Sequence, residues 1–310
     1  MRDHVLPDWW TDELADVAAN RALAEGYIAK QLGFRLRELR DAGTDLTFPA
    51  MADVRFKRYK NQVDDRVKVS ALLAQRVARV VAGHLKSRIP EFLPAGAGEI
   101  RKNVLQKSKA VDLGSLLGEC WRRGIIVLHL AEAPKRAKRF DGMACFVEGR
   151  PVIVLASNRD SPPWLAFHLA HELGHIMLGH VGPEQPYLVD DKLDNATGSN
   201  AQEREADRFA CEVLTGFESK RIGNLKQNGP RLATTAAMSG PREGIDPGVF
   251  ALIYAKSNDR WGVAQKALSF LSLDRGGRAQ VNQVLSAKLD LEDLSESDER
   301  LLSVLALTPT

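Results

Sequence analysis

The chain has few cysteines and no long run of apolar residues. Its three cysteines, Cys120, Cys145 and Cys211, are odd in number and far apart, so we expect no disulfide framework and a reducing compartment. No apolar run approaches the roughly 20 residues that cross a bilayer. The first residues also have no apolar segment typical of a secretion signal. Together these absences predict a cytoplasmic protein that does not enter a membrane.

The net charge is small, but it is unevenly distributed. The formal charge is +3, yet Arg55 to Lys109 holds fourteen Lys or Arg against four Asp or Glu. Phe56 and Tyr59 are interleaved with these basic residues. Such runs are usually the solvated face of a helix, here the one expected at Val67 to Leu85. The alternative is a contact with nucleic acid through charge and stacking.

Proline and glycine divide the chain into three expected regions. Pro90, Pro94 and the glycines at 96 and 98 mark the main boundary. We expect a helical N-terminal region (1–90), a compact core (91–216) and a helical C-terminal region (217–310). In the core, an expected helix at 113–123 precedes a strand at 125–130 and a hairpin of strands at 143–147 and 152–155. The pattern predicts an α+β fold.

The N-terminal region contains a segment typical of DNA-binding proteins. We expect helices at Thr11 to Leu23 and at Tyr27 to Arg40. Within the second, IAKQLG is typical of the second helix of a helix-turn-helix repressor. No clear recognition helix follows before Gly43. We therefore favour a degenerate helix-turn-helix that does not read DNA.

The segment from Trp164 to His180, WLAFHLAHELGHIMLGH, contains the pattern H-E-x-x-H. It is expected to be a helix, with Ser161 as N-cap and two prolines at its start, where helices tolerate proline. His171 and His175 are four residues apart, so they share a helix face and can bind one metal ion. Glu172 lies about 100° around the helix, where it can polarise a bound water without being a ligand.

Two histidines on a buried helix can also be ordinary core residues, so a third ligand matters. Catalytic zinc usually has three protein ligands and a water. The expected helix from Asn200 to Gly216 carries Glu203 and Asp207 four residues apart on one face. One of them can bind zinc while the other accepts the free ring N–H of a ligating histidine. Glu205 points to the opposite side and is the second candidate ligand, while a solvated charged face is the ordinary interpretation.

The motifs AHELGHIMLGH and EREADRFACEVL, with WRRGIIVLHL and FDGMACFVEGRPVIVLAS upstream, resemble the ImmA/IrrE family of zinc metallo-endopeptidases over about residues 111–216. The resemblance implies that His171, His175 and Glu203 bind Zn²⁺ and that Glu172 is the general base. It implies a mostly helical α+β fold. Its small zincin-like (gluzincin) core would be a short sheet packed on the H-E-x-x-H helix, between helical N- and C-terminal regions. It further implies cleavage of a helix-turn-helix transcriptional repressor in a stress or phage-defence response.

Several other residues are candidates for parts of such a site. The donor that stabilises the oxyanion could be His180, Tyr187 or Tyr254. His168 is too far along the helix axis from His175 to join both histidines as a ligand, and we interpret it as cleft lining or surface.

Cys145 is a candidate regulatory residue. Met143, Cys145 and Val147 share one face of their expected strand, because side chains alternate along a strand. If that face looks into the cleft, the Cys145 thiolate could take the fourth position on zinc and act as a latch. The ordinary alternative is a small buried apolar residue.

Two classes of function remain open from the sequence. One is an endopeptidase that cuts a folded repressor at an exposed segment able to extend along a sheet edge. The other is a DNA-associated regulator whose zinc site is structural or inactive. The presence of Glu172 favours the first, because a structural site needs no base.

Overall fold

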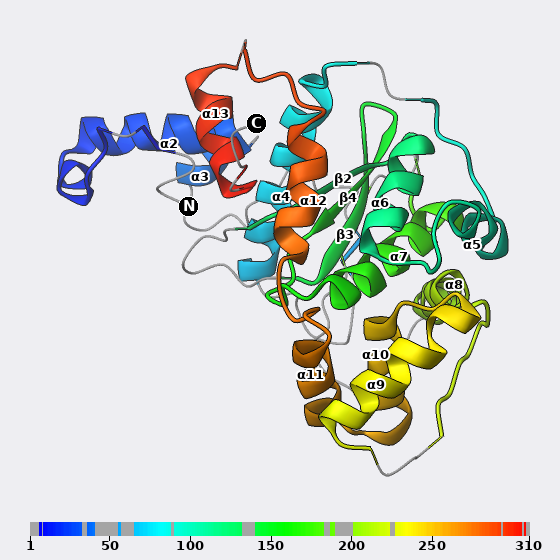
Figure 1. Ribbon diagram of the computed structural model, residues 1–310. Helices are drawn as coiled ribbons and strands as arrows, with labels where there is room; N and C mark the ends of the chain where they lie inside the picture. The colour runs from blue at the N-terminus through cyan, green and yellow to red at the C-terminus, as the bar shows by residue number, and fades with distance from the viewer. Residues whose placement is uncertain are drawn as a thin grey trace.

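The structure of the chain is a computed structural model in which a short sheet lies between helices (Figure 1). It describes residues 6–7, 9–32, 36–40, 55–56, 65–87, 90–131, 140–182, 187–189, 201–223, 227–292, 294–305 and 307. Among these residues no helix combines the length and apolar character needed to cross a membrane.

Helices make up most of the described chain. They are α2 (Ala18–Leu32), α3 (Leu36–Arg40), α4 (Asp65–Gly83), α5 (Ala97–Leu105), α6 (Leu113–Arg122), α7 (Pro162–Met177), α8 (Ala201–Thr215), α9 (Gly229–Ser239), α10 (Pro247–Asn258), α11 (Trp261–Phe270), α12 (Gly277–Ser286) and α13 (Glu296–Leu302). Short 3-10 helices are η1 (Asp12–Asp16), η2 (Pro241–Glu243) and η3 (Ser303–Leu305). The strands are β1 (Arg55–Phe56), β2 (Ile126–His129), β3 (Gly142–Val147), β4 (Arg150–Leu155) and β5 (Tyr187–Val189).

The strands form one sheet in the order β1-β5-β3-β4-β2. Strands β3 and β4 are an antiparallel hairpin whose pairing runs from Gly142 opposite Leu155 to Val147 opposite Arg150. Glu148 and Gly149 both have positive φ, as the tight turn that suits a two-residue hairpin requires. Strand β2 runs parallel to β4. The expected α+β class, mostly helical with a short sheet beside the H-E-x-x-H helix, is confirmed.

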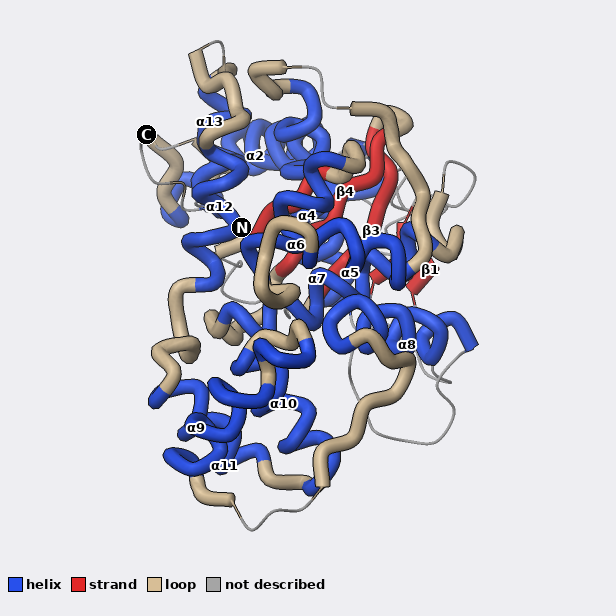
Figure 2. Tube along the Cα trace, turned by 45° about the vertical axis from the view of Figure 1, so that its right-hand side comes forward, coloured by secondary structure: helices blue, strands red, loops and turns tan. Residues whose placement is uncertain are grey.

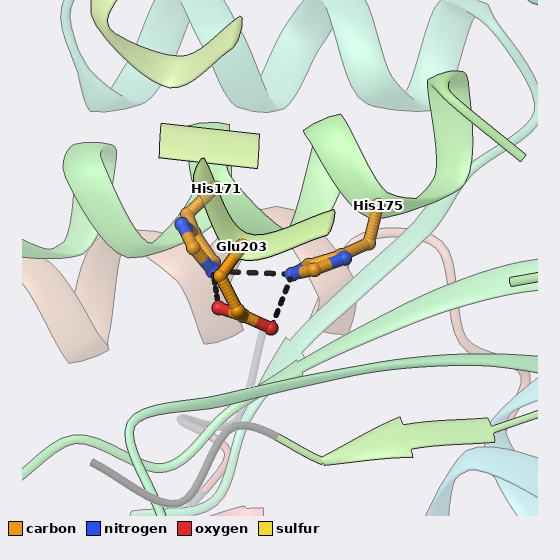
Figure 3. Close-up of side chains that lie close together, drawn as sticks. All are labelled: His171, His175 and Glu203. Atoms are coloured by element: carbon orange, nitrogen blue, oxygen red, sulfur yellow. Dashed lines mark hydrogen bonds and ion pairs between the residues drawn. The ribbon is translucent and has the colours of Figure 1, made fainter. Parts of the chain in front are cut away.

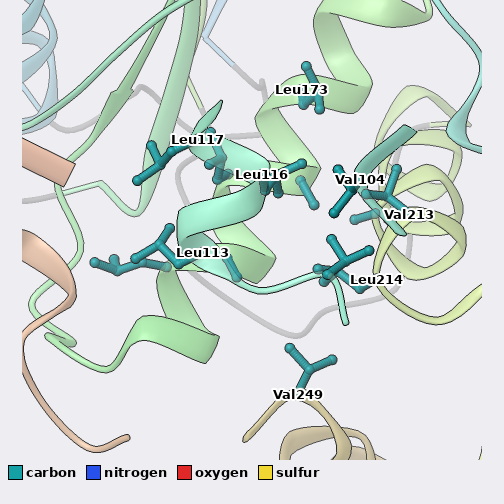
Figure 4. Packing of buried hydrophobic residues seen from close by; sticks show 14 of the residues in the cluster. Val104, Leu113, Leu116, Leu117, Leu173, Val213, Leu214 and Val249 are labelled. Atoms are coloured by element: carbon teal, nitrogen blue, oxygen red, sulfur yellow. The ribbon is translucent and has the colours of Figure 1, made fainter. Parts of the chain in front are cut away.

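Side-chain alternation divides the sheet into two buried faces. Ala144 and Phe146 of β3 pack in one hydrophobic cluster with Leu169 and Leu173 of α7, and the same cluster includes apolar residues of α5, α6 and α8 (Figure 4). The other face of the sheet packs in a second cluster with α4, α12 and α13. Alternate residues of a strand point to opposite faces, so β2, β3 and β4 each contribute to both clusters.

The outer edge of β2 is closed by a side chain. The Asn282 amide of α12 accepts from the backbone N of His129 at 2.9 Å and donates to its carbonyl at 2.8 Å. This pairing imitates a neighbouring strand and satisfies backbone groups that a buried edge would otherwise leave without partners.

Helices α9, α10 and α11 form a group in which α10 contacts α7. The group lies below the sheet in both Figure 1 and Figure 2. The hydrophobic clusters join α4, from the expected N-terminal region, and α9 to α12, from the expected C-terminal region, to the core. The three-part division of the chain stays a prediction.

The boundaries expected at the N-terminus were wrong. Thr11 precedes a 3-10 helix and makes no side-chain cap bond, while α2 runs continuously from Ala18 to Leu32. Gly26 lies inside α2, and a glycine costs a helix interior only about 1 kcal/mol, too little to end it. Residues 41–54 lie outside the described chain, so the degenerate helix-turn-helix stays a prediction.

Candidate metal centre

Helices α7 and α8 cross closely beside the sheet. Gly174 of α7 permits this approach, because a Cβ at this position would lie 3.1 Å from the Cα of Ala206 in α8. Ser161 occupies the N-cap position of α7 as expected, but its hydroxyl makes no cap bond and donates to the carbonyl of Leu273 at 2.6 Å. The crossing places the last turns of α7 against the first turns of α8.

Three side chains converge at this crossing (Figure 3). Glu203 Oε2 lies 3.1 Å from His171 Nε2, and Glu203 Oε1 lies 3.4 Å from His175 Nε2. The two Nε2 atoms are 3.2 Å apart. All three residues are buried, and one ligand atom from each lies within 4.8 Å of the others. Among the described residues this is the group of histidine, cysteine and acidic side chains that could hold a metal ion.

The second ring nitrogen of each histidine is engaged elsewhere. His171 Nδ1 lies 3.0 Å from Asp207 Oδ1. His175 Nδ1 lies 3.0 Å from His180 Nδ1, and His180 Nε2 lies 3.0 Å from Glu205 Oε2. These contacts aim both Nε2 atoms at the shared point. Two imidazoles and a carboxylate, with the other ring nitrogens held by further polar groups, fit the usual donor set of a catalytic zinc site.

The protonation of the histidine rings that metal binding requires agrees with the contacts from His175 through His180 to Glu205. A histidine that binds a metal through Nε2 carries its proton on Nδ1. His175 Nδ1 then donates to His180 Nδ1, so His180 carries its own proton on Nε2 and donates it to the Glu205 carboxylate. Glu205, the second candidate ligand from the sequence, thus contacts His180 and is outside the group that surrounds the metal position. Both nitrogens of His180 are engaged, which leaves neither for an oxyanion.

The electrostatics of the group suit an ionised carboxylate and a neutral imidazole. Burial by itself would raise the pKa of Glu203, but hydrogen bonds with His171 and His175 outweigh it and hold that pKa below its usual value. Burial lowers the pKa of His175, although Glu203 opposes this effect. Metal binding requires both of these protonation states.

Glu172 lies next to His171 but outside the three-residue group. It is buried, and strand β3 passes directly against its carboxylate. A Cβ at Gly142 would lie 2.4 Å from Glu172 Oε1 and 2.7 Å from its Cγ. Any side chain at Gly142 would therefore displace Glu172. The sequence pattern did not predict this contact, and its only available signal was the glycine directly before the strand expected at 143–147.

His168 is buried, so the interpretation as surface was wrong. Its ring stacks on Trp164 at 6.2 Å, and its Nε2 lies 3.9 Å from Asp141 Oδ1. It is absent from the metal-binding group, as its distance along the helix axis led us to expect.

Cys145 lies on the face of the sheet opposite the metal helix, so the condition for the latch is not met. Cys145 packs with Met143 and Val147 in the cluster that includes α4, whereas α7 packs on the opposite face of the sheet. Burial also raises the pKa of the Cys145 thiol well above its usual range. A thiol on this face cannot reach the metal position without turning the strand over, so the structure offers no latch there.

For Tyr187 and Tyr254, a role as the donor that stabilises the oxyanion stays a prediction. The side chain of Tyr187 and most of the loop from Val181 to Ser199 lie outside the described residues. Tyr254 is buried in α10 within the cluster that contains α7.

The basic stretch is only partly described. Residues 57–60, which contain Tyr59 and three of the basic residues, lie outside the described chain. Arg101 is buried and donates to backbone carbonyls of Val213, Glu243 and Gly244, so its charge serves the fold. A contact with nucleic acid stays a prediction.

Residues 121–215 match the family model Peptidase_M78, described as the IrrE N-terminal-like domain. The match spans just under a third of the chain, from the end of α6 to the end of α8, and so includes the core of the sheet and both helices of the candidate site. A comparison with curated proteins found no match to this chain. Residues 121–215, which contain the candidate metal centre, are therefore similar to the IrrE N-terminal-like domain of the Peptidase_M78 family.

Proposed function

We propose that this protein is a zinc-dependent endopeptidase that cleaves a helix-turn-helix transcriptional repressor in a stress or phage-defence response. The observation that carries the proposal is the buried convergence of His171, His175 and Glu203, with Glu172 in the same turn of α7. The family of the domain supports the metallopeptidase part, and the repressor and the response follow from the resemblance alone.

In this proposal His171, His175 and Glu203 hold Zn²⁺. A bound Zn²⁺ would supply Lewis acidity toward a carbonyl oxygen and toward water. Asp207 and His180 hold the two imidazoles in the orientation and tautomer that binding requires, through the 3.0 Å contacts to their Nδ1 atoms. With both Nε2 atoms as ligands, the positive charge of a bound Zn²⁺ would keep the Glu203 carboxylate ionised.

Glu172 is the general base of the proposed reaction. Its carboxylate takes a proton from the attacking water and gives it to the leaving amine. Strand β3 limits the positions open to this carboxylate, because the backbone at Gly142 lies directly against it. The base is thereby held in place before substrate arrives.

The sheet limits where an extended substrate could pair. In the described chain the outermost strands are β1 and β2. The edge of β2 at His129 is already occupied by Asn282. A repressor segment that joins the sheet as an added strand would therefore pair on the β1 side.

The test uses purified protein loaded with zinc and a small helix-turn-helix protein encoded beside its gene. Mass spectrometry should find one cut in an exposed segment of that protein, while Glu172→Gln should leave it intact. Casein-like unfolded chains should be cut slowly. Rapid, indiscriminate digestion would argue against a regulatory role.

The alternative is a DNA-associated regulator with a structural or inactive zinc site. Its support is the excess of basic residues from Arg55 to Lys109. It predicts DNA affinity that falls steeply with salt and is lost on charge reversal at Lys57, Arg58 and Lys60, without any cleavage. Lack of DNA or RNA affinity at low salt, together with cleavage of the repressor, would eliminate it.

A further inference from the structure

The metal-binding face of α7 continues into an aromatic cluster. Successive residues of a helix are about 100° apart, so Trp164, His168, His171 and His175 all fall within about 60° of one another on the helix surface. Trp164 is three turns before His175 and lies where α7 begins. The same helix face therefore presents first an indole, then His168, and then the two histidines of the candidate metal site.

Trp164 is held by residues from outside α7. The guanidinium carbon of Arg159 lies 3.9 Å from the centre of the Trp164 ring. Trp261, the first residue of α11, stacks on it with ring centres 5.5 Å apart and an angle of 25°. Trp261 remains 43% exposed. A pair of stacked indoles is thus fixed in position with aromatic surface open to solvent.

A series of neighbouring residues leads from the aromatic cluster to Glu172, the proposed base. His168 stacks on Trp164 with an angle of 21° between the rings. His168 Nε2 faces Asp141, which is followed by Gly142, the residue that touches Glu172.

We propose that Trp164 and Trp261 form a subsite for an aromatic side chain of the peptide substrate. The inference rests on the proposed endopeptidase function and deepens it by naming a substrate feature. Trp164 lies seven residues before His171, which is about 10 Å along a helix. For an extended peptide that runs along α7 and advances about 3.3 Å per residue, the recognised side chain is about three residues from the cleaved bond.

The chemistry of the subsite selects the side chain. Indole rings favour stacked or edge-on aromatic partners, and they also accept cations on their faces. Here a cation already lies on one indole, because the Arg159 guanidinium carbon is 3.9 Å from the centre of the Trp164 ring. This positive charge disfavours a basic residue of the substrate and favours an acidic neighbour beside the aromatic one. The preferred segment therefore combines an aromatic residue with nearby acidic residues.

The first experiment maps cleavage sites in a randomised peptide library by mass spectrometry. The wild-type protein should enrich aromatic residues about three positions from the cut, and Trp261→Ala should lose this enrichment. Trp261→Phe should retain most of it. For a matched pair of peptides with Phe or Ala at that position, we expect Trp261→Ala to reduce the preference for Phe by about three- to tenfold. Trp9→Ala, at another exposed tryptophan in the N-terminal region, is the control.

A second measurement separates this inference from the proposed function. Glu172→Gln protein, immobilised with zinc, is used to capture peptides from the same library without cleavage. Captured peptides should be enriched in aromatic residues, and the enrichment should disappear in the Glu172→Gln/Trp261→Ala protein, whose zinc content should be unchanged. The subsite would be overturned if wild type and Trp261→Ala cleaved with the same aromatic preference, or if Glu172→Gln and the double variant captured with the same preference. Aromatic capture without any cleavage by the wild type would instead overturn the endopeptidase function.

Discussion

The Nδ1 atoms of His175 and His180 lie 3.0 Å apart in the buried interior. His180 in turn contacts Glu205, whose side chain is about half exposed. His175 is thus oriented by the imidazole of His180, whereas His171 is oriented directly by the carboxylate of Asp207. This difference makes the role of His180 measurable.

Replacement of His180 by alanine should weaken zinc binding about 10- to 100-fold, because the ring of His175 loses the group that orients it. Competition with a chelator measures this affinity. Glu205→Gln should have a smaller effect in the same direction, since an amide still accepts from His180. Glu212→Gln, on the same helix and outside the group, is the control, and equal affinity in His180→Ala and Glu212→Gln would contradict the assignment.

Glu172→Gln should retain zinc and the fold but reduce hydrolysis about 10²- to 10⁴-fold, because the ligands remain while the base is lost. Metal analysis and a cleavage assay check the two parts separately. Full activity in this variant would eliminate Glu172 as the base.

Glu203→Ala should lose the metal, because it removes the carboxylate that contacts both Nε2 atoms. The zinc content after dialysis is the measurement. Glu205→Ala serves as comparison and should still bind zinc. Undiminished zinc in Glu203→Ala, or its loss only in Glu205→Ala, would show that the ligand was assigned to the wrong residue of α8.

Gly142→Ala should impair hydrolysis with little loss of zinc, because the added Cβ would occupy the position of the Glu172 carboxylate. Activity should fall at least about tenfold, as expected when a catalytic group moves by about 1 Å. Gly118→Ala in α6 is the control, since a Cβ there meets no atom within 4 Å. Equal activities in the two variants would mean that the strand does not position Glu172.

Asp246 should make stability depend on pH between about 4 and 6. It accepts from the backbone N of Gly248 and Val249 at the start of α10, and burial raises its pKa to about 6. Its folded pKa is above the unfolded value, so its contribution is fully present below about pH 4 and is lost as pH rises through 6.

Asp246→Asn keeps an acceptor for the cap and should remove this dependence. Relative to wild type, the variant should gain about 1–3 kcal/mol between pH 4 and pH 7. Urea unfolding at both pH values measures the difference. A parallel change in both proteins would show that Asp246 does not titrate in this range.

Helical periodicity is a local property, and it let the sequence alone determine the main elements of the site. The spacing of His171 and His175, the position of Glu172 between them, and the shared face of Glu203 and Asp207 all follow from residues three or four apart on a helix. The structure brings His171, His175 and Glu203 together and sets Asp207 against His171. The two strands of the hairpin, β3 and β4, could also be recognised from a local pattern, because apolar segments on both sides of a short turn indicate a hairpin.

Only the tertiary structure decided which way these faces point. Strand alternation correctly grouped Cys145 with Met143 and Val147, but the choice between α4 and α7 as their neighbour depends on how the whole sheet packs. The crossing of α7 and α8 likewise decided that Glu203 meets the histidines while Glu205 meets His180. Such contacts join residues far apart in the chain, and no local pattern carries the relative orientation of two elements, because it is set by the packing of the complete core.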